Sequence, residues 1–239
     1  MPLVLPLWHR DRVEPGGGLR ASVVRSMLSE RGRRSEAIRT SHHRTHSRRR
    51  NGGGRHEPAS YARLVFVVVS GLPGSGKTTL ARSLSLTLRL PLLDKDDLLE
   101  TLMDSLGVDG QDSRHRLSRA SDALLERIAG ASFGAVLTSF WRRESLSATS
   151  GTPTDWLRKL PEVVEVFCDC PPRTAAERFH ARVRHPGHRD SHQSLADSLG
   201  RFTQLASTLP LNLGPVVRVD TTQDVDVPAV AAAVLKARR

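Results

Sequence analysis

A glycine-rich loop between an apolar strand pattern and a helical pattern constrains the fold of this chain more than any other feature. Residues 71–78, GLPGSGKT, follow an apolar run at 64–69, and Leu80, Leu84 and Leu88 recur behind the loop at helical spacing. The loop fits G-x-x-x-x-G-K-[ST], in which backbone N–H groups surround phosphate oxygens. The N-terminus of the following helix directs its positive dipole end at the same anion. The stretch therefore predicts a strand–loop–helix unit that binds a nucleotide.

The loop residues have distinct expected roles. Lys77 is expected to reach the β- and γ-phosphates, and Thr78 to ligate Mg²⁺ through its hydroxyl. Glycine is expected at the loop because a side chain would collide with the phosphates or forbid a positive φ. The predicted nucleotide-binding residues are Gly71, Leu72, Pro73, Gly74, Ser75, Gly76, Lys77, Thr78 and Thr79.

Short apolar runs alternate with helical patterns along the rest of the chain. The predicted strands are 65–70, 91–94, 134–138, 162–168 and 215–219, and the predicted helices are 77–89, 96–106, 114–129, 172–183, 193–206 and 226–237. This alternation predicts an α/β fold, with a parallel sheet of about five strands and helices on both faces. Ligands of such sheets bind outside the carboxyl ends of the strands.

A cluster of carboxylates follows the second predicted strand. Asp94, Asp96 and Asp97 come directly after Leu92 and Leu93. An aspartate there can accept the proton of a substrate hydroxyl or hold the Mg²⁺ shell, and we assign this role to Asp96. Helix capping or solvation is the alternative, and we favour it for Asp94 and Asp97.

The fourth long helix and the loop behind it are rich in arginine. Guanidinium groups there can neutralise charge that develops on a transferred phosphoryl group. Arg178 and Arg182, four residues apart, are predicted to share one helical face and to act in catalysis. A solvated basic face is the alternative. The arginines concerned are Arg173, Arg178, Arg182, Arg184 and Arg189.

The histidines and cysteines give weaker signals. His185, His188 and His192 lie in one loop without the ligand spacing of a zinc site, so loop contacts or exposure are favoured over zinc. Cys168 and Cys170 lie two apart on a predicted strand, and we interpret them as small core residues, not as a redox or metal pair.

Two stretches together resemble a known family. The loop at 71–79, with residues 90–107 behind it, is similar to the small P-loop kinase group that includes chloramphenicol phosphotransferase, zeta-toxin-like kinases and bacterial AAA family ATPases. Lys95-Asp96 matches the K-D pair of that group. The similarity continues at 164–192 and 216–222, so it spans residues 63–237. The resemblance implies an adenylate-kinase-like sheet, ATP and Mg²⁺ as cofactors, and transfer of the γ-phosphoryl group to a hydroxyl.

The third predicted strand departs from this group. It ends in Thr138-Ser139, where many relatives place an acidic residue. Two interpretations are open: the metal is held through Thr78, water and Asp96, or metal handling is weakened.

The first 60 residues differ in composition from the rest. They hold 13 arginines and 5 acidic residues, whereas residues 61–239 hold 23 basic and 20 acidic residues. We expect 1–60 to be a disordered tail and 61–239 to be the P-loop kinase-like domain. A passive extension with a later start, such as Met27, a polyanion-binding segment and a targeting peptide are the three interpretations of the tail.

The predicted function is an ATP-dependent phosphotransferase acting on a small-molecule acceptor. One alternative is a nucleotide-sugar or polynucleotide 5′-hydroxyl kinase, and another is an ATP-binding regulatory module without transfer. Nucleic acid is expected as a partner only through the basic tail. No apolar run is long enough to span a membrane, so no membrane partner is expected. The expected location is the cytoplasm.

Overall fold

The computed structural model describes residues 65–142, 151–188 and 193–238. They belong to one compact unit, Pro58–Arg239. The predictions for the tail, for Arg189 and for His192 fall outside the described residues.

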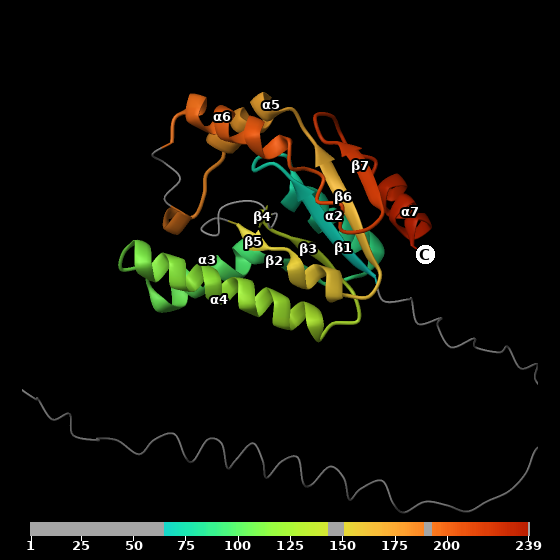
Figure 1. The fold of residues 1–239 in the computed structure, drawn as a ribbon, viewed down its shortest axis with the longest axis horizontal. Helices are drawn as coiled ribbons and strands as arrows, with labels where there is room; N and C mark the ends of the chain where they lie inside the picture. Colours follow the sequence, from blue (N-terminus) through green and yellow to red (C-terminus); the bar gives the residue numbers. More distant parts are fainter. Residues whose placement is uncertain (1–64, 143–150, 189–192, 239) are drawn as a thin grey trace, which may run out of the picture. The chain divides into compact units, whose positions relative to one another are not determined.

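A five-stranded parallel sheet forms the centre of this unit (Figure 1). Its strand order is β2-β3-β1-β6-β7, with β1 in the middle. The first and last residues of each strand lie within one residue of the predicted ones, which confirms the predicted sheet. The strands are β1 Phe66–Gly71, β2 Leu92–Asp94, β3 Ala135–Thr138, β6 Val163–Asp169 and β7 Val216–Asp220.

Helices connect the strands and confirm the predicted alternation. They are α2 Lys77–Leu88, α3 Lys95–Leu106, α4 Gln111–Gly130, α5 Pro172–Ala181, α6 Leu195–Ala206 and α7 Val227–Ala237. Short elements were not predicted: a parallel pair, β4 Trp141–Arg142 and β5 Thr152–Pro153, and the 3-10 turns η1 Asp155–Lys159 and η2 Pro186–His188.

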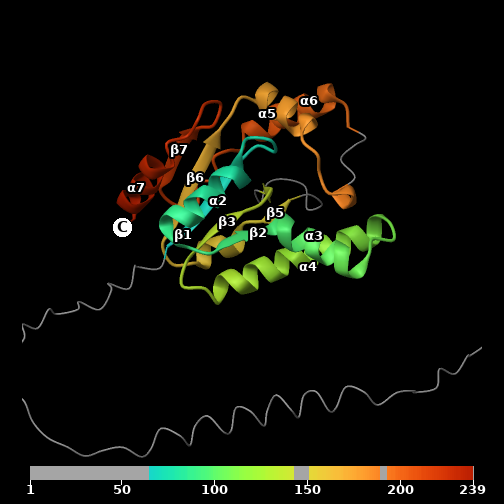
Figure 2. The same ribbon diagram turned by 180° about the vertical axis from the view of Figure 1, so that it is seen from behind.

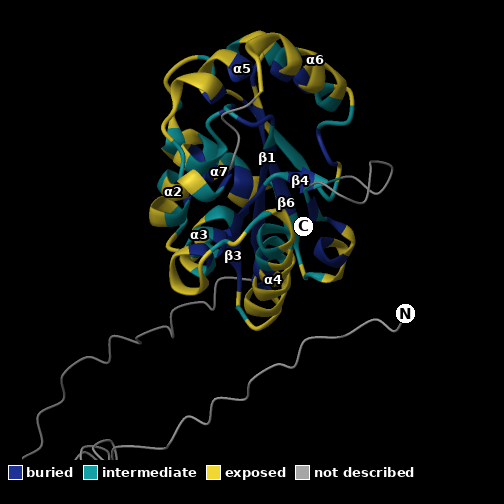
Figure 3. Cartoon of the chain, turned by 90° about the vertical axis from the view of Figure 1, so that its left-hand side faces the viewer, coloured by how far each residue is buried: buried dark blue, intermediate teal, exposed yellow. Residues whose placement is uncertain are grey.

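Alternation along β1 gives the sheet two apolar faces. Val67 and Val69 pack with Leu84 of α2 and Val234 of α7, whereas Val68 packs on the opposite face. That opposite face is covered by α4 and by the segment around η1. Figure 2 shows α2 and α7 in front of the sheet, and Figure 3 shows buried strands between helices with exposed outer surfaces. Burial of both faces explains the continuous apolar run of β1.

A third apolar cluster lies at the carboxyl ends of the strands. Leu72 of the glycine-rich loop packs there with Cys170, Phe179 of α5 and Phe202 of α6. Cys168 belongs instead to the cluster under α2, and burial raises the pKa of its thiol to about 12. Both cysteines are buried and free, which is the arrangement of core residues.

Glu165 of β6 is a fully buried acidic residue that the sequence analysis did not single out. Its carboxylate accepts hydrogen bonds from the Ser70 hydroxyl at 2.5 Å and from the backbone N–H groups of Leu211 and Asn212 at 2.8 and 2.7 Å. These bonds join β1, β6 and the segment that leads into β7. Charge-assisted bonds of this kind offset the loss of hydration.

Within the described residues, no helix has the length and apolar character that crossing a membrane requires.

Candidate active site

The glycine-rich loop has a left-handed backbone at two of its turns. Gly74 has φ +80° and Gly76, which caps α2, has φ +87°. A side chain on Gly74 would collide with the Ala175 carbonyl of α5, whereas a Cβ on Gly76 would make only an ordinary contact with Thr221 at 3.9 Å. The expected collision with phosphates is therefore only part of the reason for glycine: at position 74 the close neighbour is the α5 backbone.

Lys77, the first residue of α2, is half-buried beside this loop. Its ammonium donates a hydrogen bond to the Leu72 carbonyl at 2.7 Å. Burial is the main cause that lowers the pKa of Lys77 to about 8; the charge of Arg182 contributes to this decrease, and Cys168, Asp96 and Asp94 oppose it. An ammonium held in this position gains charge compensation when an anion enters the loop.

Asp94 lies closer to the loop than the sequence analysis expected. It ends β2 opposite Thr138 of β3, and Thr138 in turn pairs with Val69 of β1. Its carboxylate caps α3 by accepting from the Asp96 N–H at 2.9 Å, as predicted, and it lies close enough to the Thr78 side chain for that group to lower its pKa. Burial is the main cause that raises the pKa of Asp94 to about 6; the charges of Asp96 and Asp97 add to this rise, and the Asp96 N–H and the Thr78 side chain oppose it.

Asp96 and Asp97 point to different surroundings. Asp96 is partly exposed and pairs with Arg184 at 3.2 Å. Asp97 pairs with Arg82 at 3.4 Å, and both of those side chains are exposed. Asp94 and Asp96 both line the same cavity.

The two predicted catalytic arginines do not share one helical face, so this detail of the prediction was wrong. Helix α5 ends at Ala181, and Arg182 has an extended backbone with φ −86° and ψ 142°. Arg178 donates to the carbonyls of Thr221 at 2.7 Å and Thr222 at 3.3 Å. It therefore holds the loop behind β7, while Arg182 lies over the Phe179 ring at 4.9 Å.

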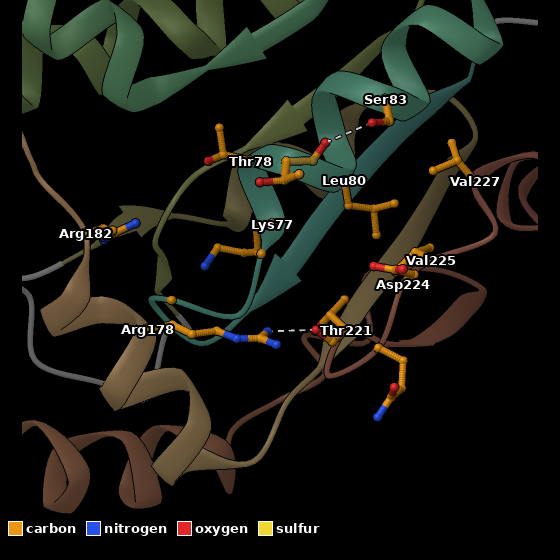
Figure 4. A pocket seen from close by; sticks show the side chains of 14 residues that line it. Lys77, Thr78, Leu80, Ser83, Arg178, Arg182, Thr221, Asp224, Val225 and Val227 are labelled. Carbon is orange, nitrogen blue, oxygen red and sulfur yellow. Dashed lines mark hydrogen bonds between the residues drawn. The ribbon is translucent and has the colours of Figure 1, made fainter.

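Figure 4 shows a cavity of about 540 Å³ between the glycine-rich loop, α2 and the loop behind β7. The Arg178 side chain extends from α5 to the Thr221 carbonyl at the edge of this cavity. Lys77 and Arg182 also line the cavity. Its volume is that of an ordinary small-ligand pocket. Other residues that line it are Gly74, Gly76, Thr78, Thr79, Asp224 and Val225.

A second cavity of about 210 Å³ lies on the α3 and α4 side of the loop. Lys77, Thr78 and Arg182 line both cavities. The two spaces therefore meet at an ammonium, a hydroxyl and a guanidinium group. The second cavity is also lined by Asp94, Lys95, Asp96, Arg114, Ser118 and Arg184.

Hydroxyl groups stand where many relatives of the resembled group have a third-strand acid. Ser139 lies 2.5 Å from the Thr152 hydroxyl, which donates to Asp122 of α4 at 2.7 Å. Burial raises the pKa of Asp122, and the bond from Thr152 lowers it. Asp94, next to Thr138 in the sheet, supplies a carboxylate close to the Thr78 side chain. No local pattern in the sequence distinguishes Asp122, because its role depends on β5 reaching α4.

The segment behind α5 packs on α3 and α4. His185 contacts Asp104 at 2.9 Å and His188 contacts Glu100 at 2.8 Å, both on α3. Arg114 of α4 donates to the Gly187 carbonyl at 3.0 Å. Loop contacts were the favoured interpretation of these histidines. The described residues contain no group of three or more acidic, histidine or cysteine side chains able to hold a metal.

The residues of the loop fit a nucleotide with Mg²⁺. The Ser75 hydroxyl is buried and has no hydrogen-bond partner among the described residues. Thr78 and Asp94 place a hydroxyl and a carboxylate side by side, and oxygen donors of this type suit Mg²⁺.

Comparisons with known proteins agree with this geometry. The profile of a family described as an AAA domain matches residues 66–205. A candidate kinase of known structure from Chloroflexus aurantiacus J-10-fl is 27% identical, with a TM-score of 0.59, over 74% of this chain and 100% of that one. Cytidylate kinases of Pyrobaculum arsenaticum and Pyrobaculum islandicum are each 44% identical over 46 residues, which is 19% of this chain. The chain thus spans about 25% of the length of these curated relatives. Together with the sheet order and the loop, these findings confirm the resemblance to the P-loop small-molecule kinase group, and the chain belongs to the AAA domain family.

Proposed function

We propose that this protein is an ATP-dependent phosphotransferase that moves the γ-phosphoryl group of ATP to a hydroxyl of a small molecule. The meeting of two cavities at Lys77, Thr78 and Arg182 carries this proposal. The larger cavity has room for a nucleotide beside the loop, and the smaller one has room for an acceptor beside Asp96. Positioning and charge compensation supply most of the rate enhancement in such a transfer.

The residues divide the reaction between them. Lys77 and Arg182 compensate negative charge on the transferring group, and Asp96 accepts the proton of the acceptor hydroxyl. The bond from the γ-phosphorus to the bridging oxygen of ADP breaks while a bond to the acceptor oxygen forms. Arg178 positions the loop behind β7 along the nucleotide cavity and takes no part in the transfer itself.

Thr78 and Asp94 are the residues that would hold Mg²⁺, with Asp96 within reach through water. The ion supplies neutralisation of the β- and γ-phosphate oxygens when it is bound. We place Asp94 before Asp96 as the first carboxylate of this site because the Thr78 side chain acts on the Asp94 carboxylate.

An assay of ADP release against a library of hydroxylated metabolites tests the proposal. ADP that forms only when ATP and one acceptor are both present, together with a phosphorylated product by mass spectrometry, is the expected result. Tight ATP binding without product for any acceptor, including oligonucleotide 5′-ends and nucleotide sugars, would favour a regulatory module instead.

A further inference from the structure

The second cavity carries an excess of positive charge. Six cationic side chains line it, Lys77, Lys95, Arg114, Arg182, Arg184 and Arg201, against two acidic ones, Asp94 and Asp96. Asp96 is already paired with Arg184, and Asp94 faces Thr78. The cavity is therefore suited to a ligand that brings negative charge of its own.

Lys95 is the most informative of these cations. Lys95 is the first residue of α3 and is 8% exposed. Its ammonium donates a hydrogen bond to the Ser118 hydroxyl at 3.0 Å. Among the described residues, no carboxylate lies within ion-pair distance of it. The Asp122 and Asp96 carboxylates act on this ammonium only from beyond ion-pair distance, and an anionic ligand would supply a counter-ion in direct contact.

Arg114, on α4, lines the same cavity as Lys95. Its Nε donates to the Gly187 carbonyl, and its two terminal nitrogens have no hydrogen-bond acceptor in the part of the chain that the structure describes. Ser118 stands one turn along the same face of α4. Guanidinium nitrogens in this arrangement form paired hydrogen bonds with carboxylate or phosphate oxygens.

The size of the cavity limits the ligand. A volume of about 210 Å³ lies below the usual range for pockets that bind drug-sized ligands. A compact molecule fits such a space.

We propose that the acceptor is a compact hydroxylated anion whose carboxylate or phosphate binds between Lys95 and Arg114 while its hydroxyl faces Asp96. This inference rests on the proposed phosphotransferase function. The hydroxyl proton passes to the Asp96 carboxylate, the acceptor oxygen gains the phosphoryl group, and ADP leaves. The anionic group of the acceptor takes no part in bond making; it fixes the orientation of the hydroxyl.

Matched acceptors test the charge requirement. Glycerol, glycerate and glycerol 3-phosphate share one skeleton, and glucose, gluconate and glucose 6-phosphate share another. We expect ADP release, and stabilisation of the complex with Mg²⁺ and a non-hydrolysable ATP analogue, to be greater with the charged members than with the neutral one. The carboxylate and phosphate members separate the two sources of charge. Equal responses to all members, or no response to any, would overturn the inference.

Variants assign the site to its residues. Lys95→Met and Arg114→Leu should each raise KM for the charged acceptor by about 10- to 100-fold with a smaller change in kcat, whereas Arg119→Gln, at an exposed position of α4, should leave it unchanged. Lys95→Met should also keep or raise the thermal midpoint of the ligand-free protein, because a buried unpaired ammonium is removed. Unchanged KM in both folded variants would contradict the assignment.

The two proposals fail in different ways. Selective binding of charged members without ADP release would refute the phosphotransferase function and leave the anion site standing. Efficient phosphorylation of the neutral members would support the phosphotransferase function and refute the anion site. CMP, included because of the cytidylate kinases among the relatives, distinguishes a phosphate acceptor: CDP formation would keep the anion preference and refute a hydroxyl acceptor.

Discussion

The Lys77 ammonium bonds the Leu72 carbonyl of its own loop, so the loop is held in shape before a phosphate arrives. We expect Lys77→Ala to lower turnover by about 100-fold or more, because a preorganised positive charge is lost at the phosphoryl group. Lys159→Ala, at an exposed position on η1, is the matched control. ADP release measures both, and circular dichroism checks the fold. Equal turnover in the two variants would contradict the assignment of the loop.

The three aspartates behind β2 should respond differently to amide substitution. Asp96→Asn should lower transfer by about 10²- to 10⁴-fold and keep ATP binding, since it removes the proton acceptor. Asp94→Asn should raise the Mg²⁺ concentration needed for half-maximal turnover, because its carboxylate faces Thr78. Asp97→Asn should be mild, as its pair with Arg82 is exposed. Magnesium titrations of ADP release separate the three, and equal losses would point to general disruption.

At the scale of elements, the segment from Arg184 to His188 connects α5 to the acidic side of α3. His188 is 5% exposed, and Arg184, Glu100 and Asp96 are the charged groups that act on it. Burial lowers the pKa of His188 from its ordinary value of 6.5, Arg184 lowers it further, and Glu100 and Asp96 oppose this. The neutral form is therefore favoured in the folded protein.

Because the pKa of His188 is lowered in the folded protein, stability should decrease at acidic pH. The unfolded chain binds the proton more readily, so the contribution of His188 is complete above pH 6.5 and declines as the pH falls below it. His188→Gln keeps a hydrogen-bond donor to Glu100 but does not titrate. The thermal midpoint of the native protein should fall more than that of the variant between about pH 7.5 and about pH 5.5. Parallel pH profiles would show that His188 does not titrate in this range.

The order of elements could be predicted from the sequence because burial on both faces leaves a continuous apolar run in each strand, as in Val67 to Val69. The glycine-rich loop could be predicted because its residues act locally. The position of Asp94 could not, since its contact with Thr78 depends on β2 lying beside β3. The end of α5 before Arg182 and the role of Glu165 likewise depend on contacts between residues distant in sequence.

At the scale of the whole molecule, the described strands and helices all lie between Phe66 and Ala237. The family match covers residues 66–205, and the Chloroflexus structure is covered completely by 74% of this chain. Both observations support a proposal that residues 61–239 form the catalytic domain and that residues 1–60, which carry 13 arginines and 5 acidic residues, are separable from it.

Removal of the first residues tests this division. A protein that begins at Ser60 should keep its thermal midpoint, its ATP affinity and its rate with a small acceptor, because it retains every element of the sheet. Any affinity for an oligonucleotide should decrease with the removal, and in the full chain it should fall steeply as salt increases, since arginine contacts to phosphates release counterions. Loss of ATP binding in the shortened protein would show that the basic segment contributes to the domain. Binding that survives both removal and high salt and depends on a 5′-hydroxyl end would instead favour a polynucleotide kinase, with the second cavity receiving the terminal nucleotide.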